Sequence, residues 1–381
     1  MVAERFISRK LKFQGNLAAI AIAVSFFVII VAVAVSSGFR HTVREGVAAM
    51  TGDVRVTPFL TGDAEPVSMP MHIPSEDRIR ALPDVKEIVP AVVRAGIVKN
   101  GDIIHGVVVK GTRQKDTTVL GVSIPRRLQE ITGLDAGDDL TVYFVGEKVR
   151  VRKFHIIRVH RDLLELDDNL LVYARLEDLQ RLNGWTEDEV SCLDIITRSD
   201  KLDRTAETIG SMLLASGEPE EEDLYVSAAS RTYPQVFDWL NLLDFNVLII
   251  LILMTVVAGF NMVSGLLIML LRNISTIGTL KTLGMDNASI GRLFVRIGAG
   301  AVLKGMLIGN ALALLFCLIQ GTTHLIPLDP ANYFVAWVPV HVNLLWILLA
   351  DAAAFAGILA LLWLPSLFIA RIDPAQTVKA D

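Results

Sequence analysis

The sequence predicts an α-helical membrane protein with four transmembrane helices and a large α+β extracytoplasmic domain between helices 1 and 2. Hydrophobic residues make up 52% of the 381 residues and charged residues only 20%. The mean hydropathy is +0.49, which is too apolar for an ordinary soluble chain. The apolar residues gather in a few long runs, and a long stretch of mixed character separates the first run from the second.

Four runs with at most one charged residue define the spans, which we place at 15–39, 245–271, 297–320 and 344–370. Each reaches the roughly 20 residues that a helix needs to cross a hydrocarbon core. A basic start followed by an apolar run also resembles a secretory signal. The run at 17–35 is longer than a signal core of about 7–15 residues, so we expect the first span to be retained.

The positions of Lys and Arg predict the orientation. Basic residues fall within 1–14, within 272–294 between spans 2 and 3, and within the tail at 371–381, whereas the connection at 321–343 has none. By the positive-inside rule, both termini and the 272–294 segment are cytoplasmic. The segment 1–14 is then an amphipathic cytoplasmic start, and 321–343 is an extracytoplasmic loop.

Residues 40–240 are predicted to form the α+β domain outside the membrane. Two β-rich arms at 95–111 meet at Asn100–Gly101, a pair that favours a tight hairpin. Alternating polar and apolar residues at 140–160, around Gly146, predict a second hairpin. Acidic residues outnumber basic ones here, which disfavours nucleic acid as a partner.

Helices alternate with these strands. Ser75, followed by two acidic residues, is typical of a helix start, and amphipathic helices are expected at 175–183 and 201–214. In the second of these, Ile209, Leu213 and Leu214 are expected on one side. The acidic run at 218–223 is interpreted as a solvated loop.

The sequence offers no catalytic, cofactor-binding or metal-binding residues. His155 and His160 lie five apart in a strand-like segment and would face opposite sides. No G-x-S-x-G, H-E-x-x-H or P-loop motif occurs. Cys192 and Cys317 fall in different regions, so no intrachain disulfide is expected. ATP and Mg, if used, are expected on a partner.

Small residues in the third span predict close helix packing. Ala301, Gly305 and Gly309 recur four apart and share one helix face, although glycine is also simply common in spans. Asn261 in the second span is expected to hydrogen-bond a neighbouring helix.

Two of the predicted spans each contain one charged residue, Lys304 or Asp351. Lys304 is close enough to the cytoplasmic end for its amine to reach the membrane surface. Asp351 lies toward the other end of its span, so the two do not predict a proton relay.

The 272–294 segment carries an apolar stripe between two spans. Ile274, Ile277, Leu280 and Leu283 recur every three residues, which predicts a short amphipathic helix. Gly284 is typical of a helix end. Asp286 or Asn287 can cap a second helix that runs into span 3. Such a helix either lies on lipid or docks into a partner's groove.

Several stretches resemble the FtsX-like permeases of ABC transporters, especially the transmembrane subunits of lipoprotein-releasing complexes, the LolC and LolE type. The resemblance rests on STIGTLKTLGMDNASIGRLF, on RTYPQVFDWLNLLDFN leading into span 2, on GFNMVSGLLIML, on IPLDPANYFVAWVPV in the outer loop and on the closing ARIDPAQTVKAD. The outer domain is similar mainly in size and in GDDLTVYF and LQRLNGW. The layout of one span, a large domain and three spans covers the whole chain.

The resemblance implies a mechanotransmitting subunit in a bacterial plasma (inner) membrane. In that family the segment between spans 2 and 3 is a coupling helix that rests on a P-loop ATPase dimer, and a second permease subunit, a copy or a paralogue, completes the pair. Lipoprotein cargo and a soluble carrier are expected partners. The implied ATPase-coupling positions in this sequence are Ile277, Leu280, Lys281, Leu283 and Gly284. The segment 5–13 is expected along the inner surface.

One departure from the family pattern concerns charge. Lys281 is the only charged residue between Arg272 and Asp286, whereas the family often has acidic residues early in this helix. Three alternatives stay open. They are an FtsX-like scaffold that activates a cell-wall hydrolase, a MacB-like efflux subunit, and an anchored ectoenzyme.

Overall fold

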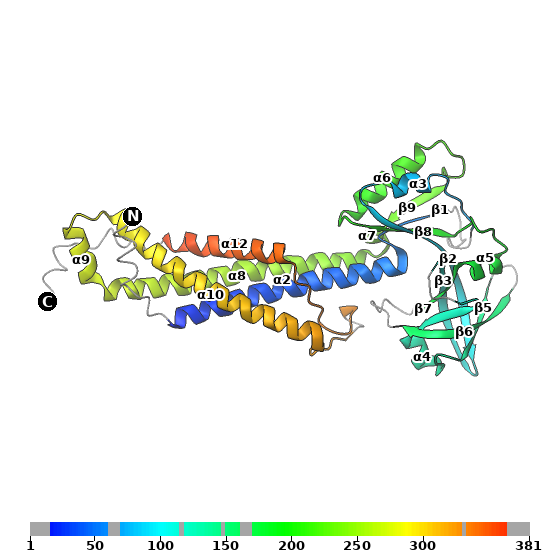
Figure 1. Ribbon diagram of the computed structural model, residues 1–381, viewed down its shortest axis with the longest axis horizontal. Coiled ribbons are helices and arrows are strands. Elements are labelled where there is room, and N and C mark those ends of the chain that lie inside the picture. Colours follow the sequence, from blue (N-terminus) through cyan, green and yellow to red (C-terminus); the bar gives the residue numbers. More distant parts are fainter. Residues whose placement is uncertain are drawn as a thin grey trace. The chain divides into compact units, whose positions relative to one another are not determined.

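The computed structural model describes residues 16–59, 69–113, 118–145, 149–160, 170–329 and 333–363 (Figure 1). The chain divides into two compact units. The membrane unit contains the described residues up to His41, Leu240–Pro327 and those from Trp337 onward, and the outer domain contains Thr42–Trp239 and Leu328–Ala336. The expected cytoplasmic segments at 1–14 and 371–381 lie outside the described residues.

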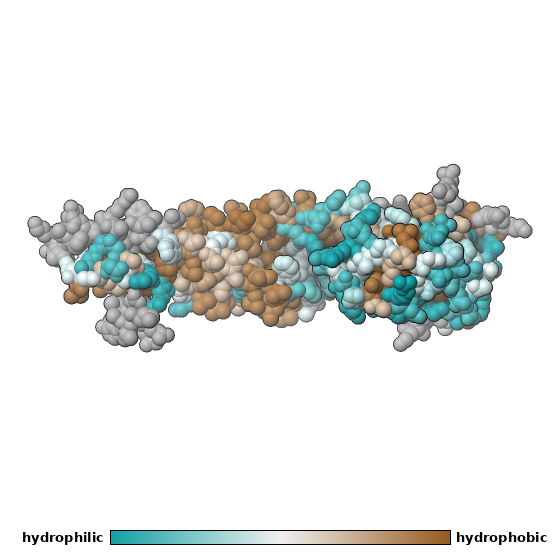
Figure 2. Space-filling view, turned by 90° about the horizontal axis from the view of Figure 1, so that it is seen from above, coloured by the Kyte–Doolittle hydropathy of each residue, from teal (hydrophilic) through white to brown (hydrophobic). Residues whose placement is uncertain are grey.

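Among the described residues, four helices are long and apolar enough to cross a membrane: α2 (Asn16–Thr51), α8 (Pro234–Arg272), α10 (Asn287–Thr323) and α12 (Leu344–Leu361). In Figure 2 hydrophobic residues cover most of their visible surface. The predicted fold class is confirmed. Three helices exceed their predicted spans. The helix α2 continues beyond residue 39, α8 begins before residue 245 at a proline suited to a first helical position, and α10 extends past 297–320 at both ends.

The fourth predicted span, 344–370, is described only in part. The helix α12 ends at Leu361, and most of the remainder of the predicted span, 364–370, lies outside the described residues. Its start is well defined, because the side chain of Asn343 accepts a hydrogen bond from the backbone N–H of Leu345 at 3.1 Å. That contact satisfies one of the donors that every helix start leaves open.

The membrane unit has one apolar core shared by all four long helices and by the short helix α9 (Ile274–Thr282). Its buried members include Ile22, Phe26, Ile29, Ala258, Met262, Ile277, Phe294, Val302, Ala354 and Ile358. Many other large apolar side chains of these helices are exposed, as expected where lipid replaces water.

The outer domain contains a nine-stranded sheet among its described residues. The strands are β1 (Val54–Pro58), β2 (Val85–Asn100), β3 (Ile103–Thr112), β4 (Gly121–Pro125), β5 (Asp139–Phe144), β6 (Arg150–His160), β7 (Leu170–Arg175), β8 (Cys192–Thr197) and β9 (Leu224–Ala228). Their order is β3-β7-β4-β6-β5-β2-β8-β1-β9, and β3 also pairs with β2. That extra pairing closes six strands into a barrel, while β8, β1 and β9 continue from β2 as an open sheet.

The barrel is filled with side chains. Phe144 and Phe154 meet edge to face with ring centroids 6.3 Å apart, and both are fully buried. Helix α4 (Arg126–Thr132) contributes the buried Leu128. A small closed barrel of this kind has a packed interior and no channel.

Both predicted hairpins are confirmed, as β2–β3 and β5–β6, although Gly146 lies outside the described residues. The first turn is one residue later than predicted, because Asn100 still pairs with Ile103 and the turn consists of Gly101 and Asp102. Gly101 has a φ of +59°, as a tight hairpin of this type requires. Asn100 stays in the strand and donates from its side chain to the carbonyl of Thr132 at 2.9 Å.

The predicted helices of the domain are present as α3 (Glu76–Arg80), α5 (Leu176–Asn183) and α6 (Leu202–Leu214), with a further short helix α7 (Ala229–Thr232). One expectation about α6 is wrong, because Leu214 is 72% exposed while Ile209 and Leu213 are buried. Leu214 lies about 100° around the helix from Leu213 and therefore points away from the covered side.

A carboxylate in the acidic run is buried, contrary to the prediction. Glu221 has no exposed surface and accepts hydrogen bonds from the backbone N–H and the hydroxyl of Ser75, at 2.7 and 3.0 Å. Ser75 therefore makes no side-chain cap at the start of α3. The acidic run joins the strand β9 to α3 through this side chain, because a buried carboxylate requires donors.

Candidate functional site: the α9 turn and the fixed end of α2

Helix α9 is attached to the core of the membrane unit by part of its apolar stripe. Ile277 is 1% exposed within the core, and Leu280 packs against the same core. The prediction that the whole stripe faces a partner is therefore wrong for Ile277, which the chain's own helices cover. Lys281 is half-buried.

The turn after α9 presents the end of the stripe outward. Gly284 has a φ of +87°, its N–H donates to the carbonyl of Lys281, and the N–H of Met285 donates to the carbonyl of Leu280, both at 3.0 Å. This pair of bonds defines a Schellman motif. Leu283, directly before the glycine, is 78% exposed. A large apolar side chain thus projects from a backbone turn fixed by hydrogen bonds.

The next helix begins immediately. Asp286 occupies the N-cap position of α10, and its carbonyl accepts from the N–H groups of Ser289 and Ile290. A hydrogen bond with the Ser289 side chain lowers the pKa of the Asp286 carboxyl below its ordinary value. A negative charge near a helix start interacts favourably with the helix dipole. The turn between α9 and α10 is therefore short and ordered at both ends.

The small residues of α10 lie against α2. A Cβ on Gly309 would be 2.4 Å from the carbonyl oxygen of Ala23, and one on Gly305 would be 2.6 Å from Ile22. Ala301 is also buried. The backbones of α10 and α2 approach so closely at Gly309 that no larger residue fits without movement.

Asn261 does not bond within the described bundle. It lies on the exposed side of α8 and makes no side-chain hydrogen bond with any of the described residues. The expected hydrogen bond to a neighbouring helix is therefore not made inside this chain.

The two charged span residues differ in burial. Lys304 is exposed, whereas Asp351 is 6% exposed and accepts a hydrogen bond from Asn310 at 2.5 Å. The pairing of Asp351 with Asn310 was not predicted, because the two residues lie 41 positions apart.

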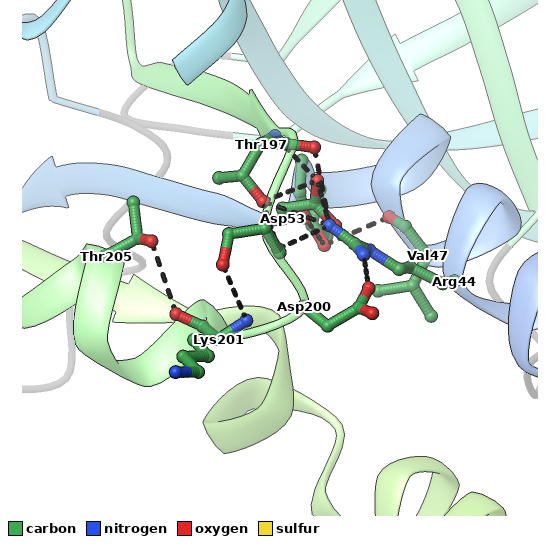
Figure 3. A network of polar contacts seen from close by, with 10 residues as sticks. Arg44, Val47, Asp53, Thr197, Asp200, Lys201 and Thr205 are labelled. Atoms are coloured by element: carbon green, nitrogen blue, oxygen red, sulfur yellow. Dashed lines mark hydrogen bonds and ion pairs between the residues drawn. The ribbon is translucent and has the colours of Figure 1, made fainter. Parts of the chain in front are cut away.

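A polar network that sequence reasoning missed fixes the end of α2 in the outer domain (Figure 3). Arg44, near the end of α2, donates to Asp53 at 3.0 Å, to the hydroxyl of Thr197 at 3.0 Å and to the carbonyl of Ser199 at 2.8 Å, and it also pairs with Asp200. The buried Asp53 in turn accepts from the backbone N–H of Thr197 at 2.7 Å. One guanidinium thus ties the helix to the end of β8.

A second network binds the last carbonyls of α2. Lys110 on β3 donates to the carbonyls of Ala49 and Met50 at 3.1 and 2.9 Å, and Arg55 on β1 donates to Met50 at 3.1 Å. Cations at the C-terminal end of a helix satisfy its open carbonyls and its dipole. The end of α2 is therefore held by strands of both the barrel and the open sheet.

Asp194 on β8 balances these two cations. It accepts from Arg55 at 2.6 and 3.0 Å and lies 2.7 Å from the amine of Lys110. Burial alone would raise the pKa of Asp194, but Arg55 and Lys110 outweigh it and hold the pKa below its ordinary value. Burial alone would lower the pKa of Arg55, and Asp194 raises it above its ordinary value. Asp194 and Arg55 therefore both stay charged at neutral pH.

The residues weighed for catalysis or metal binding do not form a site. His155 contacts Asp139 at 3.5 Å, whereas His160 bonds the hydroxyl of Ser123 at 2.8 Å, so the two rings have different partners. Within the part of the chain that the structure describes, no group of three His, Cys, Asp or Glu side chains could hold a metal ion.

Comparisons with known proteins agree with this arrangement of helices. The FtsX-like permease C-terminal family matches residues 248–374. The lipoprotein-releasing system transmembrane protein LolE of Haemophilus influenzae is 24% identical over 399 residues, which cover 96% of this chain and 94% of LolE. The resemblance to the FtsX-like permeases is confirmed. The ATPase activity of this family of ABC transporter permeases lies in a separate subunit, so the similarity implies an ATPase partner and a second permease subunit.

Two solved structures are similar to the outer domain. The extracellular domain of the noncanonic ABC-type transporter YknZ from Gram-positive bacteria is 13% identical, with 46% of this chain and 98% of that chain covered and a TM-score of 0.31. The periplasmic region of MacB from Actinobacillus actinomycetemcomitans is 13% identical, with 50% and 95% covered and a TM-score of 0.32.

Proposed function

We propose that this chain receives the motion of a separate P-loop ATPase dimer at the α9–α10 turn and passes it to the outer domain, which acts on lipid-anchored protein. The observation that carries the proposal is Leu283, which is 78% exposed on a turn fixed by hydrogen bonds. An apolar side chain in that position suits a hydrophobic pocket on a partner. ATP and Mg are bound by the partner in this proposal.

The attachment of α9 supports a mechanical role. Ile277 and Leu280 pack on the same core as α2, α8, α10 and α12, so a force on the turn reaches the spans through close-packed side chains. The helices α2 and α8 each include residues of both units. At its outer end α2 is held by Arg44, Lys110 and Arg55. These hydrogen bonds would therefore transmit motion of α2 to the outer domain.

The test is recovery of an ATPase. The full chain, tagged and purified in detergent from its native host, should bring down a P-loop ATPase that hydrolyses ATP, and Leu283→Asp should abolish that recovery. A buried aspartate without a partner in the ATPase pocket is costly. Equal recovery with Leu283→Asp, or recovery of no P-loop ATPase, contradicts the proposal.

A matched control distinguishes docking from damage. Leu214 on α6 is 72% exposed in the outer domain, so Leu214→Asp introduces the same charge at a similarly exposed leucine. It should leave ATPase recovery unchanged. Both variants should melt like the wild type, because neither leucine is part of a core.

The cargo is proposed to be a lipoprotein, by analogy with LolE of the lipoprotein-releasing system and because the barrel exposes apolar side chains. Ile97 and Ile104 at the end of the β2–β3 hairpin and Val151 on β6 are 38%, 61% and 45% exposed. Such side chains suit acyl groups or the apolar surface of a carrier. A photo-crosslinker at Ile104 should capture acylated protein or a soluble carrier. Capture of a cell-wall hydrolase instead would favour the scaffold alternative.

The second permease subunit is proposed to contact α8. An exposed Asn261 inside a span is unfavourable against lipid but favourable against another helix. Asn261→Cys should form a disulfide-linked dimer on oxidation if the partner is a second copy, and a mixed product if it is a paralogue. The placement would be contradicted if Asn261→Cys formed no crosslink while cysteines introduced at exposed positions of α12 crosslinked efficiently.

The orientation is a further part of the proposal. With both termini and α9 on the cytoplasmic side, a cysteine at Ser275 should react with a membrane-impermeant maleimide only after the membrane is opened. A cysteine at Leu214 should react in intact spheroplasts. The reverse pattern would overturn the orientation.

A further inference from the structure

The helices α10 and α12 each carry one polar side chain where they meet inside the span region. The amide nitrogen of Asn310 donates to Oδ2 of Asp351 at 2.5 Å, and Asp351 is 6% exposed. Among the described residues Asp351 forms no ion pair. A carboxylate buried in a span without a cation is costly.

Two atoms of this pair lack partners. The other carboxyl oxygen, Oδ1 of Asp351, and the amide oxygen, Oδ1 of Asn310, are both buried without a hydrogen bond. If Asp351 is ionised, both atoms are acceptors and neither can satisfy the other. A single proton on Oδ1 of Asp351 turns that atom into a donor. The two unsatisfied atoms then have complementary roles.

We propose that Asp351 holds a proton and forms a cyclic pair with Asn310 that latches α10 to α12. In the pair the Asn310 amide N–H donates to Oδ2 of Asp351, and the Asp351 O–H donates to Oδ1 of Asn310. The proton comes from water, and its loss leaves a carboxylate with one remaining hydrogen bond. Both hydrogen bonds between α10 and α12 are therefore present only while Asp351 holds the proton.

The charged groups on the surrounding elements do not replace that proton. Asp351 is the only charged residue of α12, and neither α8 between Asp244 and Arg272 nor α2 before Arg40 carries any. On α10 the nearest cation along the helix is Lys304, which is exposed and about 9 Å of helix rise from Asn310. Arg292 and Arg296 lie further toward the start of α10. Among the described residues no cation is left to pair with this carboxyl, so a proton is what neutralises it in this proposal.

Infrared difference spectroscopy tests the proton directly. Full-length protein in lipid nanodiscs at neutral pH is compared with Asp351→Asn. The difference should contain the carbonyl stretch of one protonated carboxylic acid, and in Asn310→Leu that band should shift because the acid loses its amide partner. A difference that contains only carboxylate bands overturns the proposal.

Asp244 on α8 provides the matched control. It is ion-paired with Arg40 and accepts from the hydroxyl of Ser36 at 2.7 Å. Its surroundings stabilise a carboxylate, so the difference between wild type and Asp244→Asn should contain carboxylate bands and no protonated acid. The same Asp→Asn substitution should thus remove a protonated-acid band at position 351 and carboxylate bands at position 244.

Thermal melting supplies a second readout. Asp351→Asn keeps a donor and an acceptor toward Asn310, so its melting temperature should equal that of the wild type. Asp351→Leu and Asn310→Leu should each melt lower, because each leaves a buried polar group unpaired. The double leucine variant should regain part of the loss. If Asp351→Asn melts as low as Asp351→Leu, the site requires a charge and the proposal fails.

Discussion

The two units bury a carboxyl group in different ways. Asp194 in the outer domain has two cations within hydrogen-bond distance, and those cations also serve the carbonyls of α2. Asp351 in the membrane unit has one neutral amide, and two atoms of that pair lack partners. The first group is stabilised by opposite charge and the second, as we propose, by a proton.

The difference reflects what each environment supplies. A β-domain brings side chains from several strands to one point, so β1, β3 and β8 deliver Arg55, Lys110 and Asp194 together. Spans deliver few polar groups, because each one is costly to insert. Close packing of small residues then becomes the main means of joining helices. Variants in the two units should therefore fail by different mechanisms.

The largest effect is expected for Asp194→Ala. Removal of this carboxylate leaves Arg55 and Lys110 buried without their counter-charge, which should lower the free energy of unfolding by about 3–5 kcal/mol. The measurement is chemical unfolding of the full chain in detergent, followed by Trp fluorescence. The control is Asp139→Ala, since Asp139 pairs with Lys153 at the surface and its loss should hardly change the midpoint. Equal midpoints for both variants would show that the buried cluster contributes nothing.

A smaller effect is expected in the membrane unit for Gly309→Ala. The new Cβ would meet the carbonyl of Ala23 at 2.4 Å, which is backbone and cannot turn away. Overpacking of this kind costs about 1–3 kcal/mol. Gly300→Ala is the matched control on the same helix, because its Cβ would have nothing within 4 Å. Thermal melting in detergent should separate the two variants, and identical melting would disprove close packing of α10 on α2.

These two sites also show what the sequence could predict. The stripe of Ala301, Gly305 and Gly309 was visible because helical periodicity is local, and so were the spans, the hairpins and the glycine that ends α9. The cluster around Asp194 was not, because its members lie on three strands far apart in the chain. The sequence also could not show which side of α9 is covered, since Ile277 and Leu283 are equally apolar and only tertiary packing distinguishes them.

Acid should weaken the outer domain through the same cluster. The folded-state pKa of Asp194 is below the unfolded value of about 3.9. Its contribution to stability is therefore present above that value and is lost as the pH falls through the folded pKa. Unfolding midpoints measured from pH 7 down to pH 3 should fall for the wild type. Asp194→Asn should start lower and fall less, and parallel curves would assign the acid sensitivity to other carboxyls.

The smallest expected signal is the reaction of Cys192 with a maleimide, which reports whether the cluster is dry. Cys192 is fully buried, and burial, with the nearby Asp194 charge, raises its pKa to about 11. At pH 7 the thiolate fraction is then about 1 in 10,000, whereas an ordinary thiol is a few per cent ionised. Labelling of the folded chain, followed by mass spectrometry, should be undetectable over minutes and should appear in Asp194→Ala, because loss of the counter-charge opens the cluster to water. Rapid labelling of the wild type would mean that water already reaches Asp194. Asp194 and Asp351 would then differ in their access to water, and ion pairing would no longer explain the difference.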